Sequence, residues 1–420
     1  MEMDAQKRER GMEMDRILCD ELLEEVLRRI PLRPSVSADV SLVSKRWLRL
    51  YRSSISCLHL RLSPDNCAPT SLSSFLSHFP RLVLLFATIV GGDDVSNFPD
   101  QILLSIASSC PKLRALRLKS EPVSLFPLIS LSTSCPHLTS LHIAQARPFS
   151  FHWLVFLHSL QMLTIVFTPV PGEVDQVDAL QRNFNAALKL ETLVLDGIQR
   201  CDFGFASLWR SCKNLKTLRL YRCDGIGDDT SASSFVDCFN GLQEVELKWC
   251  GSIVNDILMR LVENCTSLNT LLIYHVGLKT MALAMSSKLE ELSLINCKVE
   301  PGLLVTLGQR FRNLRELDLS FNEMLVDEEF ISMLASCNCL RGLNVRGCEG
   351  LANASVVSMF KSCKQLESVD ILNCPGIGAE AVELLVLNCP QLRLIWVEES
   401  KLSDVSRSWS SKNFVLVLNV

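Results

Sequence analysis

Aliphatic residues recur along this chain in one short pattern, L-x-x-L-x-L, with polar or variable residues between them. Two weaker copies start at Ile55 and Leu82, and twelve clear copies follow, which makes fourteen. The clear copies start at Leu113, Leu138, Leu160, Leu190, Leu215, Leu242, Leu268, Leu289, Leu314, Leu340, Leu366 and Leu392. From Leu190 onward the copies start 21 to 27 residues apart. A fixed period of this length predicts an array of stacked repeats.

Each copy predicts a short strand, because its aliphatic residues alternate with residues of other kinds. Between copies the spacing becomes helical, as at Ile257, Leu258 and Leu261 in the segment 255–264. We therefore expect an α/β solenoid with a curved parallel sheet inside and helices outside. From roughly Ile55 to Val397 the pattern resembles the cysteine-containing class of leucine-rich-repeat proteins.

The eighteen cysteines fall largely into two columns set by this register. The first column, eight residues after the first leucine, is Cys223, Cys250, Cys297, Asn322, Cys348 and Cys374. The second, three residues before it, is Cys110, Cys135, Cys212, Cys265, Cys337, Cys363 and Cys389. We expect the first to sit inside the solenoid and meet loop backbone amides, and the second to end the helices. Neither column supplies the paired ligands of a zinc site, so the thiols are predicted to be reduced and metal-free.

The segment before the repeats predicts a small helical module. Asp20 is the expected N-cap of a helix that Pro31 ends. Its aliphatic residues, which the spacing places on one face, are Leu22, Leu23, Val26, Leu27 and Ile30. A second apolar set follows at Val36, Val40, Leu42, Val43, Trp47, Leu48 and Leu50. So few apolar residues form a marginal core, which favours a partner surface.

Three pieces of this module, 18–27 (LCDELLEEVL), 30–33 (IPLR) and 41–47 (SLVSKRW), resemble an F-box. Cys19 stands where that family usually has proline, and the interval from Pro31 to Trp47 is slightly long. The resemblance implies binding to a Skp-type adaptor and, through it, to the cullin of an SCF ubiquitin ligase. The implied adaptor-binding residues are Leu18, Leu22, Val26, Ile30, Pro31, Leu42, Val43 and Trp47. The alternative is that the module only caps the solenoid.

The expected domain organisation is a disordered extension at 1–14, the F-box at 15–54, the solenoid at 55–400 and a C-terminal cap at 401–420. The cap is expected to act through Phe414 to Leu418, since an uncapped solenoid exposes its core. The long spacing before Leu190 predicts a protruding loop from Thr168 to Ala187.

Composition narrows the function classes. A net charge of -4 and an isoelectric point near 6.0 give no global attraction to nucleic acid or anionic membranes. No apolar run approaches the ~20 residues that span a bilayer, which together with the reduced thiols predicts a nuclear or cytoplasmic protein. No phosphate loop, zinc pair or nucleophile elbow is present, so we expect no enzyme activity and no cofactor, a small-molecule or inositol-phosphate ligand being left open.

The register also predicts where a target protein binds. Residues two, four and six positions after the first leucine point to the concave side, and the next residue lies at its rim. The candidate target-binding residues are Arg219, Tyr221, Arg222, Lys248, Trp249, Tyr274, His275, Phe321, Arg346 and Trp396. Exposed aromatic and arginine side chains dominate interface hot spots, and the mixed charge of the column favours a protein over a polyanion.

The sequence therefore predicts a substrate-recruiting subunit of an SCF-type ubiquitin ligase, in which the F-box docks on the adaptor and the repeats hold a protein target. Two alternatives are open. One is a leucine-rich-repeat scaffold or inhibitor that acts outside any ligase, and the weaker one is a repeat protein with an enzyme-like small-molecule site.

Overall fold

The computed structural model describes residues 19–30, 40, 42–91, 97–146, 150–167, 187–251, 253–278, 288–299, 302–310, 312–412 and 416–418. The chain divides into two compact units, Met1–Lys189 and Leu190–Val420. Most of the predicted 168–187 loop, and the Phe414 part of the predicted cap, lie outside the described residues. Within the described ranges, no helix is both long enough and apolar enough to cross a membrane.

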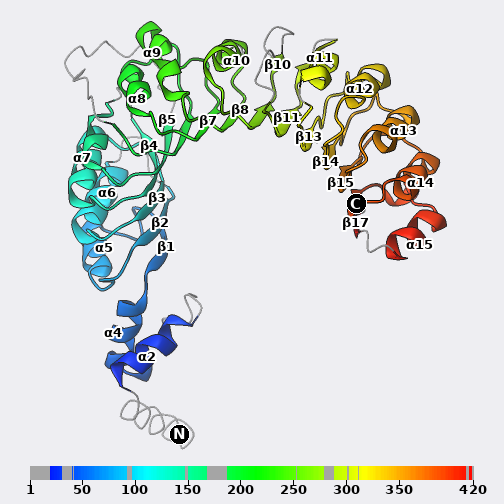
Figure 1. Ribbon diagram of the computed structural model, residues 1–420. Helices are drawn as coiled ribbons and strands as arrows, with labels where there is room; N and C mark the ends of the chain where they lie inside the picture. The colour runs from blue at the N-terminus through cyan, green and yellow to red at the C-terminus, as the bar shows by residue number, and fades with distance from the viewer. Residues whose placement is uncertain are drawn as a thin grey trace, which may run out of the picture. The chain divides into compact units, whose positions relative to one another are not determined.

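In its described residues, the first unit has two short helices, followed by a parallel sheet with helices on one side (Figure 1). Its strands β1 to β5 pair in sequence order. The elements are α2 (Asp20–Arg28), α4 (Lys45–Ser54), β1 (Cys57–Leu62), α5 (Pro69–Leu76), β2 (Leu84–Ile89), α6 (Phe98–Ser109), β3 (Ala115–Lys119), α7 (Leu125–Ser134), β4 (Ser140–Gln145), the 3-10 helix η1 (His152–Phe156) and β5 (Met162–Phe167).

The second unit repeats the strand-then-helix plan, and its strands follow a curved path with the helices on the convex side (Figure 1). Its first half holds β6 (Thr192–Asp196), α8 (Phe205–Ser211), β7 (Thr217–Tyr221), α9 (Asp229–Ser234), η2 (Phe235–Cys238), β8 (Glu244–Lys248), α10 (Ile253–Asn264), β9 (Thr270–Tyr274), β10 (Gly277–Leu278), β11 (Glu291–Ile295) and β12 (Lys298–Val299). Its second half holds α11 (Leu303–Arg310), β13 (Glu316–Asp318), α12 (Asp327–Leu334), β14 (Gly342–Asn344), α13 (Asn353–Ser362), β15 (Ser368–Asp370), α14 (Ala379–Asn388), β16 (Leu394–Trp396), η4 (Glu399–Lys401), α15 (Asp404–Lys412) and β17 (Leu416–Leu418).

Strands β6, β7, β8, β9, β11, β13, β14, β15, β16 and β17 pair in parallel in that order, and β10 pairs only with β12. The α/β leucine-rich-repeat solenoid predicted from the sequence is thus confirmed. Each of the fourteen copies of the pattern supplies one strand, and β17 adds a strand at the C-terminal edge by pairing with β16.

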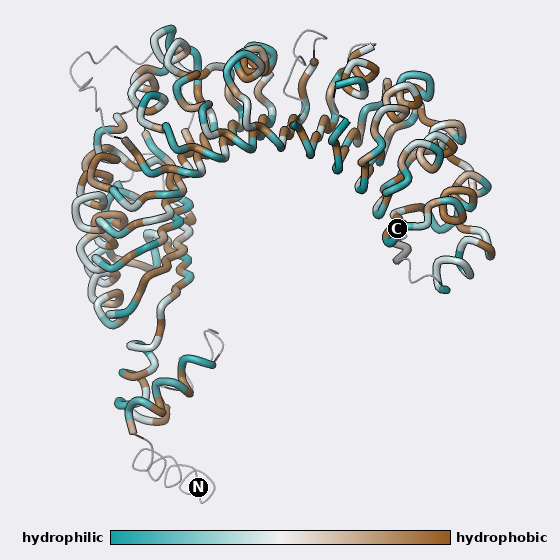
Figure 2. Tube along the Cα trace, viewed as in Figure 1, coloured by the Kyte–Doolittle hydropathy of each residue, from teal (hydrophilic) through white to brown (hydrophobic). Residues whose placement is uncertain are grey.

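The core is built from the pattern leucines. Leu218 and Leu220 have no exposed surface, whereas Thr217, Arg219 and Tyr221 between them are half-exposed. Figure 2 shows the same alternation of hydrophobic and hydrophilic residues along neighbouring strands of the second unit. Since the strands are stacked in register, the buried leucines of each repeat contact those of the next and form a continuous core.

The first cysteine column lies inside the turns and meets loop backbone amides, as expected. Amides of the preceding repeat approach the thiols, as those of Phe321 and Asn322 approach Cys348, and Asn322 Oδ1 accepts from the Cys297 amide. The thiols also act as donors. The thiol of Cys348 donates to the carbonyl oxygen of Leu319 over 3.1 Å, and that of Cys374 donates to that of Val345 over 3.1 Å.

The second column occupies helix C-terminal ends, as expected, with Cys110, Cys135 and Cys363 as C-cap residues. All eighteen cysteines are free, and thirteen of them are buried. Burial, reinforced by neighbouring Cys135, raises the pKa of the Cys110 thiol to about 12. Burial likewise raises the pKa of Cys348 to about 12.

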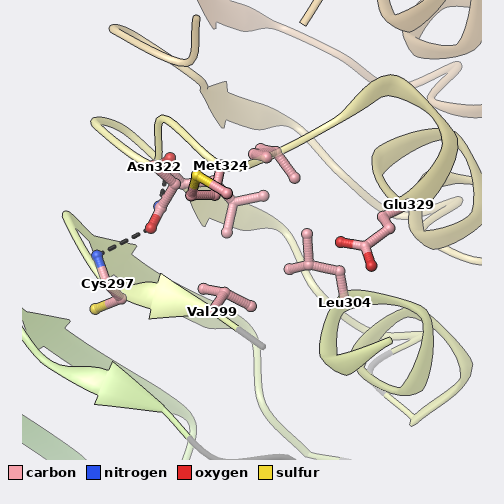
Figure 3. Close-up of a pocket in the computed structure, with 8 residues that line it drawn as sticks. Cys297, Val299, Leu304, Asn322, Met324 and Glu329 are labelled. Carbon is pink, nitrogen blue, oxygen red and sulfur yellow. Dashed lines mark hydrogen bonds between the residues drawn. The ribbon is translucent and has the colours of Figure 1, made fainter. Parts of the chain in front are cut away.

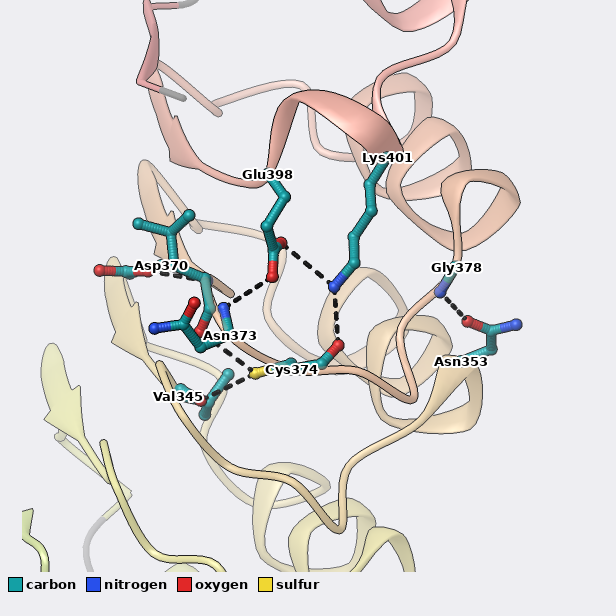
Figure 4. Close-up of polar contacts among 9 residues, drawn as sticks. Val345, Asn353, Asp370, Asn373, Cys374, Gly378, Glu398 and Lys401 are labelled. Atoms are coloured by element: carbon teal, nitrogen blue, oxygen red, sulfur yellow. Dashed lines mark hydrogen bonds and ion pairs between the residues drawn. The ribbon is translucent and has the colours of Figure 1, made fainter. Parts of the chain in front are cut away.

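Two charged side chains, Glu398 and Lys401, bind backbone groups near the end of the last full repeat (Figure 4). The backbone amide of Asn373 donates to the Glu398 carboxylate over 2.8 Å, whereas the equivalent amide one repeat earlier donates to a backbone carbonyl. Lys401 pairs with Glu398 at 3.1 Å and donates to the carbonyl oxygen of Cys374 over 2.7 Å. A carboxylate and an ammonium thus satisfy backbone groups near the end of the array.

The alternation along β7 predicts opposite effects for neighbouring residues. Leu218→Ala leaves a cavity in the core and should lower the free energy of unfolding by roughly 2 to 5 kcal/mol. Thr217→Ala, on the open face of the same strand, should change it by less than about 1 kcal/mol. Urea unfolding followed by circular dichroism measures both, and similar midpoints for the two variants would contradict the assigned register.

The thiol columns predict a labelling pattern. The thiolate is the reactive form of cysteine, so burial and a raised pKa should both slow alkylation. In the folded protein at pH 8, iodoacetamide should modify Cys19 and Cys201, the two exposed cysteines, well before any of the thirteen buried ones. In denaturant all eighteen should react without a reductant. Mass spectrometry of the peptides provides the test, and a set of cysteines that reacts only after reduction would refute the reduced state.

Candidate functional site

The amino-terminal module is a helix pair. In α2, Leu23 and Leu27 are buried against α4, which itself buries Leu50 and Tyr51. An ion pair joins the two helices at one end, with Arg46 Nη2 2.6 Å from Asp20 Oδ1. The segment that resembles an F-box therefore forms a small core of its own.

The structure revises one expectation for α2 and refines another. Its N-cap is Cys19, which makes no side-chain capping bond, and Asp20 is the first helical residue, where its charge favours the positive helix end. The aliphatic face of α2 is only partly covered, because Leu22 and Val26 are 58% and 51% exposed while Leu23 is fully buried. Leu22 and Val26 point away from the helix pair.

The other predicted adaptor-binding residues differ in how far their side chains are exposed. Leu42 is 84% exposed and Val43 is 41% exposed, at the start of the segment that leads into α4. Ile30 and Trp47 are half-buried, and Leu18 and Pro31 lie outside the described residues. The module thus presents four exposed aliphatic side chains, more than its small core requires to fold.

On the second unit, seven of the predicted target-binding residues come together on three adjacent strands, β7 to β9, and at their ends. They are Arg219, Tyr221, Arg222, Lys248, Trp249, Tyr274 and His275. Phe321, Arg346 and Trp396 lie on the later repeats of β13, β14 and β16 and are not part of this group.

Two carboxylates position the first part of this group. Arg219 bridges Glu244, at 2.8 Å, and Glu246, at 3.3 Å. The Tyr221 hydroxyl donates to Glu246 over 2.9 Å. Burial, followed by this hydrogen bond, raises the pKa of Tyr221 to about 12, so the phenol stays protonated at neutral pH. Arg219 and Tyr221 are therefore held in fixed orientations.

The second part is an aromatic cluster. The indole of Trp249 stacks on the His275 ring with centroids 5.3 Å apart and 16° between the planes. The Lys248 ammonium lies 4.6 Å from the Trp249 ring centroid and 5.1 Å from that of Tyr274. Trp249 remains 51% exposed, so the cluster offers a large, preorganised apolar surface beside a cation.

The rim residues share one backbone conformation. Seven positions after the first leucine of eight consecutive copies, φ is positive: Gly197 (91°), Arg222 (50°), Trp249 (55°), His275 (57°), Asn296 (49°), Phe321 (61°), Gly347 (68°) and Asn373 (57°). The backbone turns out of the strand here while the amide still pairs with the next repeat, as from Arg222 to the Lys248 carbonyl at 2.8 Å. Bulky residues rarely adopt this conformation, so Trp249 and Phe321 occupy positions that favour glycine.

Sequence reasoning missed some partners in the site. Asp196 holds Arg222 through two hydrogen bonds of 2.8 and 2.6 Å. Its place six residues after Leu190 was the signal that could have identified it. The column as a whole has mixed charge, with Arg219 and Lys248 among Glu244 and Glu246, but on the open face of β11 to β15 Arg346 is the one cation. The carboxylates there are Glu291, Glu316, Asp318 and Asp370.

Two carboxyl groups of that face have raised pKa values, partly because other carboxylates lie nearby. Burial, with the nearby Glu291 and Glu367, raises the pKa of Glu316 above its ordinary value. Burial raises the pKa of Asp370 as well, with Asp318 contributing. The basic side chains of a partner protein suit such a surface better than a polyanion does.

Figure 3 shows a small pocket between β12 and the helices α11 and α12, with room for about one water molecule. Cys297, Leu304, Asn322 and Met324 are among its lining residues. It cannot hold a substrate of ordinary size. In the described part of the chain, no three His, Cys, Asp or Glu residues are grouped so as to bind a metal ion.

Comparison with known proteins gives a likeness of fold. No protein-family model and no curated protein matches the sequence. Among solved structures the chain is similar to one in the crystal structure of the Rad7 and Elc1 complex in yeast. The two are 14% identical in sequence, the match covers 96% of this chain and 94% of that chain, and the TM-score is 0.44.

Proposed function

We propose that this protein is the substrate-recruiting subunit of an SCF-type ubiquitin ligase, with residues 15–54 as its F-box, the repeats at 55–400 as its target-binding part and 401–420 as a cap. The F-box would bind a Skp-type adaptor and, through it, a cullin. The observation that carries this proposal is the F-box-like segment itself. It folds as a helix pair with its own core and yet exposes Leu22, Val26, Leu42 and Val43.

Exposed aliphatic side chains on so small a module are best explained by a partner that covers them. The helix pair is also linked to the repeats, through an ion pair between Glu24 and Arg81. That link would let an adaptor-bound module hold the solenoid in a defined orientation.

The target would bind on the open face and rim of β7 to β9. There the Trp249–His275 stack supplies apolar contact, and Arg219 and Tyr221 are fixed by carboxylates, which lowers the entropy cost of binding. In such a complex this chain performs no chemistry. It raises the local concentration of the target near the enzyme that transfers ubiquitin.

A specific observation supports the scaffold alternative too. The same Glu24–Arg81 pair would serve a module that only caps the first repeat. The two functions differ in whether the exposed face of α2 binds an adaptor, so point substitutions on that face separate them better than removal of residues 1 to 52, which would also remove the Glu24–Arg81 ion pair.

The adaptor prediction concerns Leu22→Asp combined with Val26→Asp. Both residues are more than half exposed, so the helix pair should remain folded. Charges placed in an apolar contact should reduce adaptor capture at least about tenfold. Pulldown of a purified Skp-type adaptor with cullin measures it, and Phe126→Asp, at a 69% exposed position on α7, is the matched control. Equal capture by all three proteins would reject the F-box assignment.

The target prediction uses a fivefold alanine variant at Arg219, Tyr221, Lys248, Trp249 and Tyr274. Loss of anchors of this kind typically costs at least about 2 kcal/mol each at hot spots, so targets should escape ubiquitination while adaptor capture persists. Quantitative proteomics of cells that express the variant should show the targets accumulating. The control replaces five exposed residues of the helical side, Met259, Glu263, Glu328, Leu384 and Leu387. Unchanged target turnover in the fivefold variant would place recognition elsewhere.

A further inference from the structure

The sheet of the first unit has an open face whose charge is one-sided. The described helices α5 to α7 lie on the opposite side of the sheet (Figure 1). None of the residues at the open-face positions of β1 to β5 is Asp or Glu. Those positions carry Arg61 on β1, Arg117 and Lys119 on β3, and His142 on β4.

The strand register brings these groups into two neighbouring rows. Arg61 is in register with Thr88, and Thr88 with Lys119. Arg117 is in register with His142. Neighbouring strands are about 4.8 Å apart, so the four side chains fall within a strip about 15 Å wide.

Among the described residues, these cations have no carboxylate partner of the kind that other cations of the chain have. In the same unit Arg46 pairs with Asp20, and in the second unit Arg222 pairs with Asp196. No ion pair or side-chain hydrogen bond links Arg61, Arg117 or Lys119 to any described residue. The positive charge of the face is therefore uncompensated within the described part of the chain.

The pKa of His142 reflects this positive charge. Burial, and then the charges of Arg117 and Lys119, lower its pKa to about 4. The imidazole is thus neutral at physiological pH and can donate a hydrogen bond without adding to the repulsion. In the same row, on the other side of Arg117, an apolar stack is already formed, because the rings of His59 and Phe86 have their centroids 4.5 Å apart and 6° between their planes.

We propose that the open face of β1 to β4 is a second protein-binding surface, which takes an acidic segment of a partner protein. The Asp and Glu side chains of that segment would pair with Arg61, Arg117 and Lys119. An apolar side chain among them would pack on the His59–Phe86 stack. A protein is favoured over nucleic acid because the open-face positions of the described strands β1 to β5 carry three permanent charges and the whole chain carries a net charge of -4.

This surface is independent of the proposed adaptor and target contacts, so its test uses the full chain without adaptor. The probe is a displayed library of random twelve-residue peptides. Peptides enriched in Asp and Glu should be recovered by the unaltered protein. Their recovery should fall at least about tenfold with the variant Arg117→Gln/Lys119→Gln, and in about 0.5 M salt.

The control variant Lys112→Gln/Arg114→Gln removes two exposed charges from the turn before the same strand, off the open face, and should keep the acidic class of peptides. Three results would overturn the proposal. They are the absence of an acidic class, its persistence in Arg117→Gln/Lys119→Gln, and its displacement by a single-stranded oligonucleotide at lower concentration than by a free acidic peptide. None of them affects the adaptor pulldown, so failure here is distinguishable from failure of the proposed function.

Discussion

A single repeat of this chain cannot bury its own leucines, and the remaining structure follows from that constraint. Leu218 is covered only because its strand lies in register with Leu193 on one side and Val245 on the other. Once that register is set, every second residue must face away from the core. Stacking between repeats, more than any contact within one repeat, therefore determines which side chains are available to partners.

The same constraint explains why the fold could be predicted so fully. Leucines at fixed offsets identify strand, face and period together, so the sequence alone located the strand of each of the fourteen copies and the polar residues between them, although not β10, β12 or β17. Contacts between repeats were harder to foresee. The Arg222–Asp196 and Tyr221–Glu246 pairs join residues about one repeat apart, and the hydrogen bond from Cys348 to the Leu319 carbonyl likewise crosses from one repeat to the one before it. For α2, periodicity showed an apolar helix, but only the position of α4 decides that Leu23 is inside and Leu22 outside.

Net charge proved a poor guide to the surfaces. A net charge of -4 over the whole chain suggests a protein surface that is weakly acidic and nearly uniform in charge. The sheet faces of the two units differ sharply instead, since the first has cations and no carboxylate while β11 to β15 carry Glu291, Glu316, Asp318 and Asp370 against Arg346. Screening limits each field to about 8 Å at physiological salt, so a partner responds to the nearest few side chains and not to the whole chain.

The row of left-handed residues at the rim has a consequence for how such a protein can change. Backbone hydrogen bonds to the next repeat hold that conformation, and the chain fills it with glycine, asparagine, arginine, tryptophan, histidine and phenylalanine alike. Side-chain identity at this position is thus not set by the core, but it is set by the neighbouring rim residue, because a Cβ at Gly347 would lie 2.7 Å from the Phe321 ring. A lineage of duplicated repeats can diversify its binding repertoire there, provided that a large residue on one repeat is matched by a small one beside it.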